Sequence, residues 1–548
     1  MGLERGARVA VLSENRPEWL ISDYALLAAG AVPVPIYTSL SPAQIEYILS
    51  NSGAWGIIVS TPELLGKING IRPRLPDLKL VIVMDAGPGA ADPVAVFKEV
   101  VKRGGELVGR DPDAFRRVSA AAQPSDLASI IYTSGTTGPP KGVMLTHANI
   151  VSNVEATGAL FDFTPADRAL SFLPLSHIFE RTADYLYMSY GVTIVHAAME
   201  DLPEALRAMK PTVIAAVPRL FEKMRDRIES RVAGLPETRR RLFRWAHDAG
   251  RAACLAPLTG APAPVVARLR YALADRLVLR NVRANLGGRL RYAISGGAPL
   301  PRDVLEYFIS LGVTIVEGYG LTETSPVIAI NDPRALRPGT VGRPIHGTEV
   351  RLGSDGEILA RGPGVMLGYF NDAPATALAL EDGWFRTGDI GALDGDGFLS
   401  ITDRKKDLII TSGGKNIAPQ PLESALCASG LIAQAVVIGN TRRFVSALIV
   451  PEKEAFARLC SDLGVRAEPR AEAIAHPMVV AAFQRGVEAA LRDFAAFEQV
   501  RKFTILTREF SIEEGEMTPT LKIRRRVVEE RHRREIDAMY VDGGTVAP

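Results

Sequence analysis

Short apolar runs rich in valine and isoleucine alternate along the chain with longer segments in which apolar residues recur at helical spacing. The short runs predict β-strands at residues 7–12, 30–36, 56–59, 78–84, 127–131, 192–195, 213–217 and 313–316. Alternation of strands with helical patterns is typical of layered folds in which most strands are parallel. We therefore predict an α/β fold that contains mixed and parallel sheets covered by helices.

The pattern changes near Asp403, where turn-rich β structure gives way to a smaller and more charged segment. This segment has strand patterns of its own at residues 436–438 and 445–450. At 548 residues the chain is also too long for one hydrophobic core. We predict a large N-terminal domain of several subdomains, residues 1–403, and a small α+β C-terminal domain, residues 404–548.

The composition is that of a soluble enzyme. Lys and Arg number 64 against 62 Asp and Glu, and the net charge of +2 gives no bulk affinity for nucleic acid. No apolar run approaches the roughly 18 to 20 residues of a membrane-spanning helix, and the N-terminus has no signal-peptide layout. The scattered Cys254, Cys427 and Cys460 fit a reducing compartment and lack metal-ligand spacing. We expect a cytoplasmic protein whose membrane contact, if any, is peripheral.

One loop carries the strongest chemical signal. Residues 132–142 read YTSGTTGPPKG and directly follow the apolar run 127–131. Glycine lets successive backbone N–H groups turn toward an anion, hydroxyl groups donate further hydrogen bonds, and Lys141 supplies a cation. The loop therefore predicts a site for a nucleotide polyphosphate, with an ordinary surface loop as the alternative. It is not a Walker A loop, because Lys141 follows two prolines and precedes Gly142.

Four further segments favour the nucleotide interpretation. They read RYAISGGAPL at 291–300, VEGYGLTETSP at 316–326, GWFRTGDIG at 383–391 and DRKKDLIITSGGKNIAP at 403–419. In this order, together with 132–142, they resemble the adenylate-forming superfamily of acyl-CoA synthetases, luciferases and peptide-synthetase adenylation domains. The resemblance covers nearly the whole chain. It is greatest for long-chain fatty-acid CoA ligases, through LPLSHIFER at 173–181 and TPTLK at 518–522.

The resemblance implies a two-step reaction that uses ATP, Mg²⁺ and coenzyme A. A carboxylate attacks the α-phosphorus of ATP and expels pyrophosphate, and a thiol then displaces AMP from the acyl-adenylate. Such chemistry requires positioning and positive charge rather than a strong nucleophile. The chain has no Gly-x-Ser-x-Gly elbow, and its seven histidines show no zinc-like pairing. We predict an AMP-forming ligase for medium- to long-chain fatty acids.

The resemblance also implies roles for residues of the large domain. Those expected to hold the phosphates are Thr133, Ser134, Gly135, Thr136, Thr137, Gly138 and Lys141. Glu323, assisted by Thr133, is expected to bind Mg²⁺, because a hard cation favours oxygen ligands. Thr322 is expected to contact the α-phosphate, and His177 to line the acyl entrance. Those expected around the adenine and the acyl chain are Gly297, Ala298, Glu317, Gly318, Tyr319 and Gly320, with the Tyr319 ring as the stacking surface.

In the small domain, the resemblance implies a lid that rotates between the two half-reactions about a hinge at residues 403–407. Asp389 of the large domain is expected to bind the ribose hydroxyls, and Arg404 is expected to reach the same ribose from the hinge. Gly413, Gly414 and Lys415 are expected near coenzyme A, although Ile410 and Thr411 stand where some relatives carry a basic residue. Lys522 is expected to enter the site and bridge the substrate carboxylate and the phosphate in the transition state.

Each assignment has a plainer structural alternative. Glu323 is otherwise a solvated or helix-capping residue, Tyr319 a core residue and Asp389 a turn residue. His177 is otherwise a satisfied structural histidine. Lys522 precedes Arg524, Arg525 and Arg526, and such basic runs are commonly solvated.

The segment 221–286 is rich in Arg, Leu and Ala at helical spacing and predicts a helical insertion. Its basic face is typical of a solvated surface. The alternatives are contact with an anionic membrane or guidance of a fatty acid toward the site.

Three matters stay open. In the resembling family the passage at residues 1–20 lies well inside the N-terminal domain, so we expect this chain to lack the first strand and helix and to expose apolar surface there. An acyl-AMP ligase that loads a separate carrier protein, or a non-catalytic relative that binds nucleotide or lipid, is an alternative function. The oligomeric state is undetermined, a homodimer included.

Overall fold

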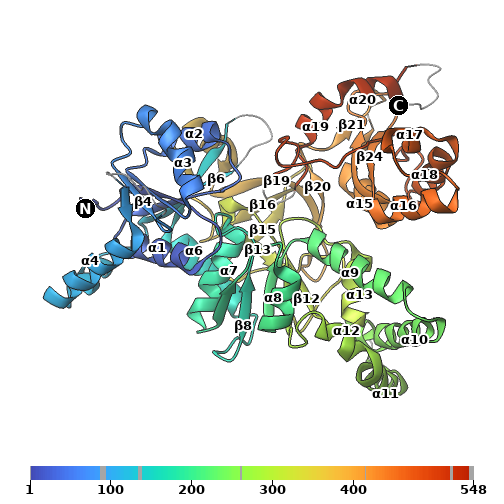
Figure 1. Ribbon diagram of the computed structural model, residues 1–548, viewed down its shortest axis with the longest axis horizontal. Coiled ribbons are helices and arrows are strands. Elements are labelled where there is room, and N and C mark those ends of the chain that lie inside the picture. Colours follow the sequence, from blue (N-terminus) through green and yellow to red (C-terminus); the bar gives the residue numbers. More distant parts are fainter. Residues whose placement is uncertain are drawn as a thin grey trace. The chain divides into compact units, whose positions relative to one another are not determined.

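The computed structural model describes residues 2–86, 94–133, 139–259, 262–413, 415–518 and 522–541 (Figure 1). These residues form two compact units. The large unit comprises Met1–Arg351, Leu359–Thr387 and Leu393–Ser400. The small unit comprises Leu352–Ile358, Gly388–Ala392 and Ile401–Pro548.

The large unit begins with a parallel five-stranded sheet of order β2-β1-β3-β4-β5. Its strands are β1 (Arg8–Leu12), β2 (Val32–Ile36), β3 (Gly56–Val59), β4 (Leu80–Val83) and β5 (Val94–Val96). The accompanying helices are α1 (Pro17–Ala28), α2 (Pro42–Ser52), α3 (Pro62–Ile71), α4 (Phe97–Arg110) and α5 (Ala114–Ser119). Central parallel strands have both faces covered, and β3 is accordingly buried at all its positions.

A seven-stranded sheet of order β14-β13-β12-β11-β10-β8-β9 forms the middle of the large unit. Its strands are β8 (Arg168–Ser171), β9 (Thr193–His196), β10 (Val213–Ala216), β11 (Tyr292–Ser295), β12 (Ile315–Gly320), β13 (Val327–Ile330) and β14 (Arg343–Pro344). The pairs from β9 to β12 in this order are parallel, whereas β13 is antiparallel to both β12 and β14. The helices of this region are α6 (His147–Gly158), α7 (Ile178–Ser189), α8 (Leu202–Met209) and α13 (Arg302–Ser310).

The predicted helical insertion lies between β10 and β11. It contains α9 (Pro218–Ala233), α10 (Glu237–Cys254), α11 (Val265–Ala274) and α12 (Arg280–Ala284) (Figure 1). Helix α10 packs closely on α13. A Cβ added to Gly250 of α10 would lie 1.9 Å from the carbonyl oxygen of Ser310 in α13, so the two backbones can approach this closely only with glycine at position 250. Within the described ranges, no helix has the length and apolar character needed to cross a membrane.

Two smaller sheets follow, the second of which has residues in both units. One is antiparallel, with the order β17-β7-β6, and contains β6 (Leu127–Thr133), β7 (Lys141–Thr146) and β17 (Gly368–Tyr369). The other contains β15 (Glu349–Leu352), β16 (Glu357–Arg361), β18 (Leu380–Glu381), β19 (Trp384–Leu393) and β20 (Leu399–Arg404). The short helix α14 (Ala373–Ala379) precedes β18.

The small unit is built on a three-stranded sheet of order β23-β24-β25. The strands are β23 (Ile432–Ile438), β24 (Ser446–Pro451) and β25 (Lys502–Ile505), and a separate pair joins β21 (Ile409–Ile410) to β22 (Asn416–Ile417). The helices are α15 (Pro419–Ala428), α16 (Lys453–Asp462), α17 (Arg470–Ala475), α18 (Pro477–Ala490), α19 (Arg525–Arg531) and α20 (Arg533–Met539).

Alternate residues of β23 enter two different cores. Val437 packs in a cluster with Leu422 of α15 and Phe483 of α18, whereas Val436 packs in a cluster with Val528 and Ile536. This is the period of two expected for a strand whose faces are both covered. Both faces of β23 are therefore covered within the small unit.

Candidate active site

Several predicted residues meet at one edge of the seven-stranded sheet. Ser295, the last residue of β11, pairs with Glu317 of β12 and with Ala216 of β10. Gly296, Gly297 and Ala298 come directly after β11, while β12 continues through Gly318 and Tyr319. Because parallel strands end at the same edge, these segments lie side by side where open α/β sheets commonly bind ligands.

A tight turn after β12 carries Thr322 and Glu323. The Leu321 N–H donates to the Pro326 carbonyl oxygen at 3.0 Å, and a Cβ on Gly320 would lie 1.7 Å from that same oxygen. Only glycine therefore fits at this position. The Met366 N–H donates to the Glu323 carbonyl oxygen at 2.9 Å, so the segment before β17 holds the backbone of Glu323.

Tyr369 connects the predicted phosphate loop to the predicted metal ligand. Thr133 at the end of β6 pairs with Lys141 at the start of β7. The Lys141 Nζ atom lies 4.9 Å from the centroid of the Tyr369 ring, within cation–π range. The Tyr369 hydroxyl donates to Glu323 Oε1 at 2.9 Å. The predicted residues between the two strands, 134–138, lie outside the described residues.

Sequence reasoning missed Tyr369, and no local signal could have identified it. The residue reaches the loop only because β17 pairs with β7, which places Tyr369 opposite Val143. Burial raises the pKa of the Tyr369 hydroxyl, so this group stays protonated and remains a donor to Glu323.

The donor set around Glu323 fits a phosphate-bound divalent cation. In the part of the chain that the structure describes, no group of three or more His, Cys, Asp or Glu side chains could by itself hold a metal ion. Mg²⁺ typically takes one or two protein carboxylates and completes its shell with phosphate oxygens and water. Glu323 supplies one such carboxylate, and Lys141, on the ring of Tyr369, suits the phosphate oxygens.

Glu317 is a buried carboxyl group on β12. Desolvation raises its pKa to about 7, although a hydrogen bond from the Leu300 backbone acts in the opposite direction. Near neutral pH the group therefore exists both with and without its proton. It can donate or accept a hydrogen bond at the sheet edge.

His177 is the N-cap of α7. Its Nδ1 atom accepts a hydrogen bond from the Phe179 N–H at 3.1 Å, so the neutral ring carries its proton on Nε2. The Phe179 ring lies against the predicted glycine pair, because a Cβ on Gly296 would be 3.0 Å from Phe179 Cζ. The cap supports a structural role for Nδ1, and any substrate contact of His177 would have to come from Nε2.

A buried ion pair fixes α7 relative to the strand that leads into the phosphate loop. Arg181 is fully buried and donates to Asp23 of α1 at 3.0 Å and to the Ser129 hydroxyl of β6 at 2.7 Å. Charge-assisted bonds of this kind are strong where water is excluded. Arg181 therefore ties helix α7 to both α1 and β6.

In the small unit, Asp389 and Arg404 contact each other. The Arg404 Nε atom lies 3.2 Å from Asp389 Oδ1, and the Asp389 side chain is only 6% exposed. Gly388, with φ of +72°, precedes the aspartate, and its carbonyl oxygen accepts the Lys405 N–H at 2.8 Å. The two residues predicted to share the ribose are thus adjacent in the structure.

The other predicted residues of the small unit lie apart from this pair along the chain. Gly413 is exposed, and the Lys415 Nζ atom lies 5.4 Å from the centroid of the Phe497 ring. Gly414 is outside the described residues. Lys522 is half-buried in a paired segment: its N–H donates to Thr518 Oγ1 at 3.1 Å, and its carbonyl oxygen accepts the Thr518 N–H at 2.8 Å.

Comparison with known proteins establishes the family. The profile of the AMP-binding enzyme family matches residues 1–370, and that of the AMP-binding enzyme C-terminal domain matches residues 406–543. The long-chain-fatty-acid–CoA ligase FadD15 of Mycobacterium tuberculosis is 38% identical over 548 residues, covering 98% of this chain and 89% of the relative. The long-chain-fatty-acid–CoA ligase ACSBG2 of Xenopus laevis is 34% identical, covering 100% and 78%. This chain belongs to the AMP-binding enzyme family.

Solved structures show the same fold. The anthranilate CoA ligase AuaEII in complex with anthranoyl-AMP matches with a TM-score of 0.72 at 21% identity, covering 98% of this chain and 89% of that one. The O-succinylbenzoate coenzyme A synthetase MenE from Bacillus subtilis, in complex with ATP and magnesium ion, matches with a TM-score of 0.64 at 23% identity, covering 96% and 89%. The predicted α/β fold, family and ligase class are confirmed. The roles of individual residues and the domain boundary at residue 403 stay predictions.

Proposed function

We propose that this protein is an AMP-forming ligase that joins a medium- to long-chain fatty acid to coenzyme A through an acyl-adenylate. The observation that carries the proposal is the connection of Lys141 to Glu323 through Tyr369 beside the edge of the parallel sheet. It places a cation and a carboxylate, the groups that a metal-bound polyphosphate requires, near one another. The fatty-acid substrate is inferred from the relatives, which are named long-chain-fatty-acid–CoA ligases at 38% and 34% identity.

In the first half-reaction, a carboxylate oxygen of the fatty acid attacks the α-phosphorus of ATP, and pyrophosphate leaves. Lys141 would attract the β- and γ-phosphates, and Thr322 would donate a hydrogen bond to the α-phosphate. Glu323 would hold Mg²⁺, which neutralises phosphate charge when bound. Tyr319 would lie against the adenine, and Gly297 would allow the backbone to approach the purine.

The small unit would supply the remaining groups. Asp389 and Arg404 would bind the ribose, and the Lys522 ammonium group would bridge the substrate carboxylate and the α-phosphate as negative charge shifts between them. In the second half-reaction, the thiol of coenzyme A attacks the acyl carbonyl carbon and AMP leaves. Lys415 would contact coenzyme A during that step.

Pyrophosphate release tests the proposal. We expect release that depends on fatty acid, shows an optimum in chain length and is stimulated by coenzyme A. Turnover that needs an acyl-carrier protein and ignores coenzyme A would favour a carrier-loading ligase. ATP binding without pyrophosphate release, for every acid in the series, would favour a non-catalytic nucleotide-binding protein.

Replacing Asp389 with alanine is expected to weaken ATP binding by roughly one order of magnitude, because hydrogen bonds to a charged group contribute about 1.5–3 kcal/mol. Equilibrium titration with ATP measures the effect. Asp355→Ala is the matched control, since Asp355 pairs with Lys405 at 2.6 Å in the same unit. Unchanged affinity in the Asp389 variant would show that this residue only shapes the turn.

We also propose that helix α11 forms a peripheral membrane contact. Val265, Val266, Leu269 and Leu273 are 69%, 67%, 67% and 52% exposed, and α11 also carries Arg268 and Arg270. An apolar stripe with arginines suits the surface of an anionic bilayer.

Co-sedimentation with anionic phosphatidylglycerol vesicles tests the contact. The double variant Leu269→Asp, Leu273→Asp is expected to reduce the bound fraction severalfold. Leu107→Asp is the control, because Leu107 is 55% exposed on α4. Equal binding of both variants and of the parent protein would rule out α11 as the contact.

A further inference from the structure

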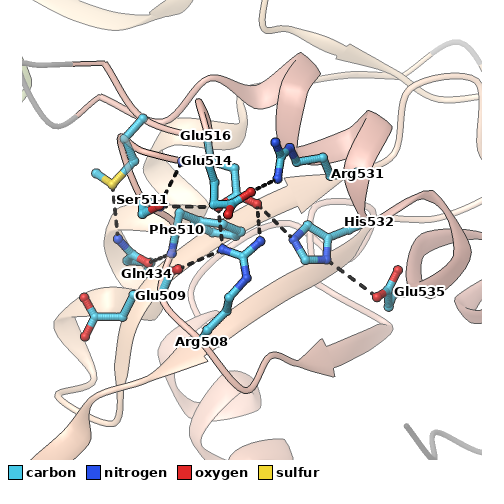
Figure 2. Close-up of polar contacts among 11 residues, drawn as sticks. Gln434, Arg508, Glu509, Phe510, Ser511, Glu514, Glu516, Arg531, His532 and Glu535 are labelled. Atoms are coloured by element: carbon cyan, nitrogen blue, oxygen red, sulfur yellow. Dashed lines mark hydrogen bonds and ion pairs between the residues drawn. The ribbon is translucent and has the colours of Figure 1, made fainter. Parts of the chain in front are cut away.

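The Glu516 carboxylate is fully buried and is contacted by Arg508, Ser511 and His532 (Figure 2). Arg508 donates to its two oxygens with both terminal nitrogens, at 2.6 and 2.7 Å. The Ser511 N–H donates at 3.3 Å, and His532 Nε2 lies 3.4 Å from Oε1. Burial alone would raise the pKa of Glu516, but the bonds from Arg508 and Ser511 outweigh it and hold the pKa below its usual value.

The backbone of Glu516 is the base of the paired segments that carry Lys522. The Arg524 N–H donates to the Glu516 carbonyl oxygen at 2.7 Å. Met517 and Ile523 form an antiparallel bridge, and Thr518 and Lys522 exchange the bonds described above. Residues 516, 517 and 518 thus pair with residues 524, 523 and 522, so that the pairing runs without a break from Glu516 to Lys522.

The side chains around Glu516 come from segments that follow elements of the small unit's core. Arg508 follows β25, and His532 follows α19. Phe510 lies two residues after Arg508, and its N–H donates to Gln434 Oε1 of β23 at 2.8 Å (Figure 2). Glu514 and Arg531 form a second ion pair that ties the same segment to α19. The carboxylate therefore joins the paired segments to the sheet.

We infer that Glu516 is a positioning residue for acyl-adenylate formation: it sets the location of Lys522 without contacting the substrate. The inference rests on the role proposed above for Lys522. Both oxygens of the Glu516 carboxylate accept hydrogen bonds from donors in fixed places, and this holds the segment in one arrangement. A glutamine at this position would turn an N–H₂ group, which cannot accept, toward one of these donors. A lysine that must reach a transition state is sensitive to small displacements of its backbone.

Glu516→Gln keeps the size of the side chain and removes its charge. We expect the rate of adenylation, measured as fatty-acid-dependent pyrophosphate release, to fall by about tenfold. The reaction of preformed acyl-AMP with coenzyme A should change by less than about twofold, because Lys522 is not assigned to that step. Equal losses in both half-reactions would indicate general damage to the small unit and would overturn the inference.

A double-mutant cycle tests whether Glu516 acts through Lys522. If it does, Glu516→Gln should cause no further loss of adenylation in the Lys522→Ala background. Additive losses would overturn the inference. Normal adenylation by Lys522→Ala would instead refute the proposed role of Lys522, so the two failures are distinguishable.

Asp537→Asn is the matched control, because it likewise removes the charge of a carboxylate that pairs with an arginine in the same unit: Asp537 pairs with Arg442 at 2.5 Å. We expect both half-reactions of this variant to stay at parent levels.

Arg508→Lys provides a second perturbation that keeps the charge but removes the two-pronged contact. It should show the same selective loss of adenylation even if Glu516→Gln fails to fold, and faster amide hydrogen exchange at residues 511–518. Unchanged exchange and unchanged adenylation in Arg508→Lys would contradict the inference.

Discussion

Replacing Lys522 with alanine is expected to lower the rate of acyl-adenylate formation by about two to three orders of magnitude, the usual effect of removing one group that stabilises charge in the transition state. The substrate carboxylate and the α-phosphate are both negative, and the ammonium group would be the cation between them. The second half-reaction has no such requirement. Transfer from preformed acyl-AMP to coenzyme A should therefore remain near the parent rate, and the two steps can be measured separately as pyrophosphate release and thioester formation.

Arg526→Ala is the control for the Lys522 experiment. Arg526 belongs to the neighbouring basic run, has a side chain that is 59% exposed and pairs with Glu530 at 3.1 Å. If Lys522 were only part of a solvated basic run, the two variants would behave alike. Similar modest effects of both substitutions, or equal loss of both half-reactions in Lys522→Ala, would contradict the assigned role.

Glu323→Gln is expected to lower adenylation by about a hundredfold and to raise the Mg²⁺ concentration needed for half-maximal rate. Glutamine preserves the shape of the side chain and an oxygen that can accept the Tyr369 hydroxyl, which donates at 2.9 Å to the carboxylate. It removes the negative charge, and a hard cation binds a neutral amide oxygen more weakly. The measurement is the rate of pyrophosphate release over a Mg²⁺ titration at saturating ATP.

Tyr369→Phe distinguishes the contribution of the Tyr369 hydroxyl from that of the Glu323 carboxylate. The variant keeps the ring that faces the Lys141 ammonium group at 4.9 Å but loses the donor to Glu323. We expect a smaller loss, about tenfold or less, with little change in the Mg²⁺ requirement. A Mg²⁺ curve that is unchanged in Glu323→Gln would show that this glutamate supports the turn rather than the metal.

Much of the fold was predictable because strand patterns are local. The strand expected at residues 313–316 illustrates the limit: β12 runs from Ile315 to Gly320, through the glycines that normally weaken a strand. Gly318 pairs with Ile330 and Tyr319 with Ala329 of the antiparallel β13, and this partner supplies the stabilisation that the residues themselves lack. The strand therefore extends further into the site than its apolar pattern indicates.

The sequence by itself determined the family and the chemical character of the site. Hydroxyls, glycines and Lys141 between two strands predict a phosphate site from local backbone and charge properties, and the order of five such segments defines the enzyme class. What only the tertiary structure decided are the contacts between distant segments. Tyr369 reaches Lys141 and Glu323 through the pairing of β17 with β7, and Glu516 meets Arg508 and His532 in the interior of the small unit. Such contacts depend on which elements pack together, a property of the whole chain that no local pattern contains.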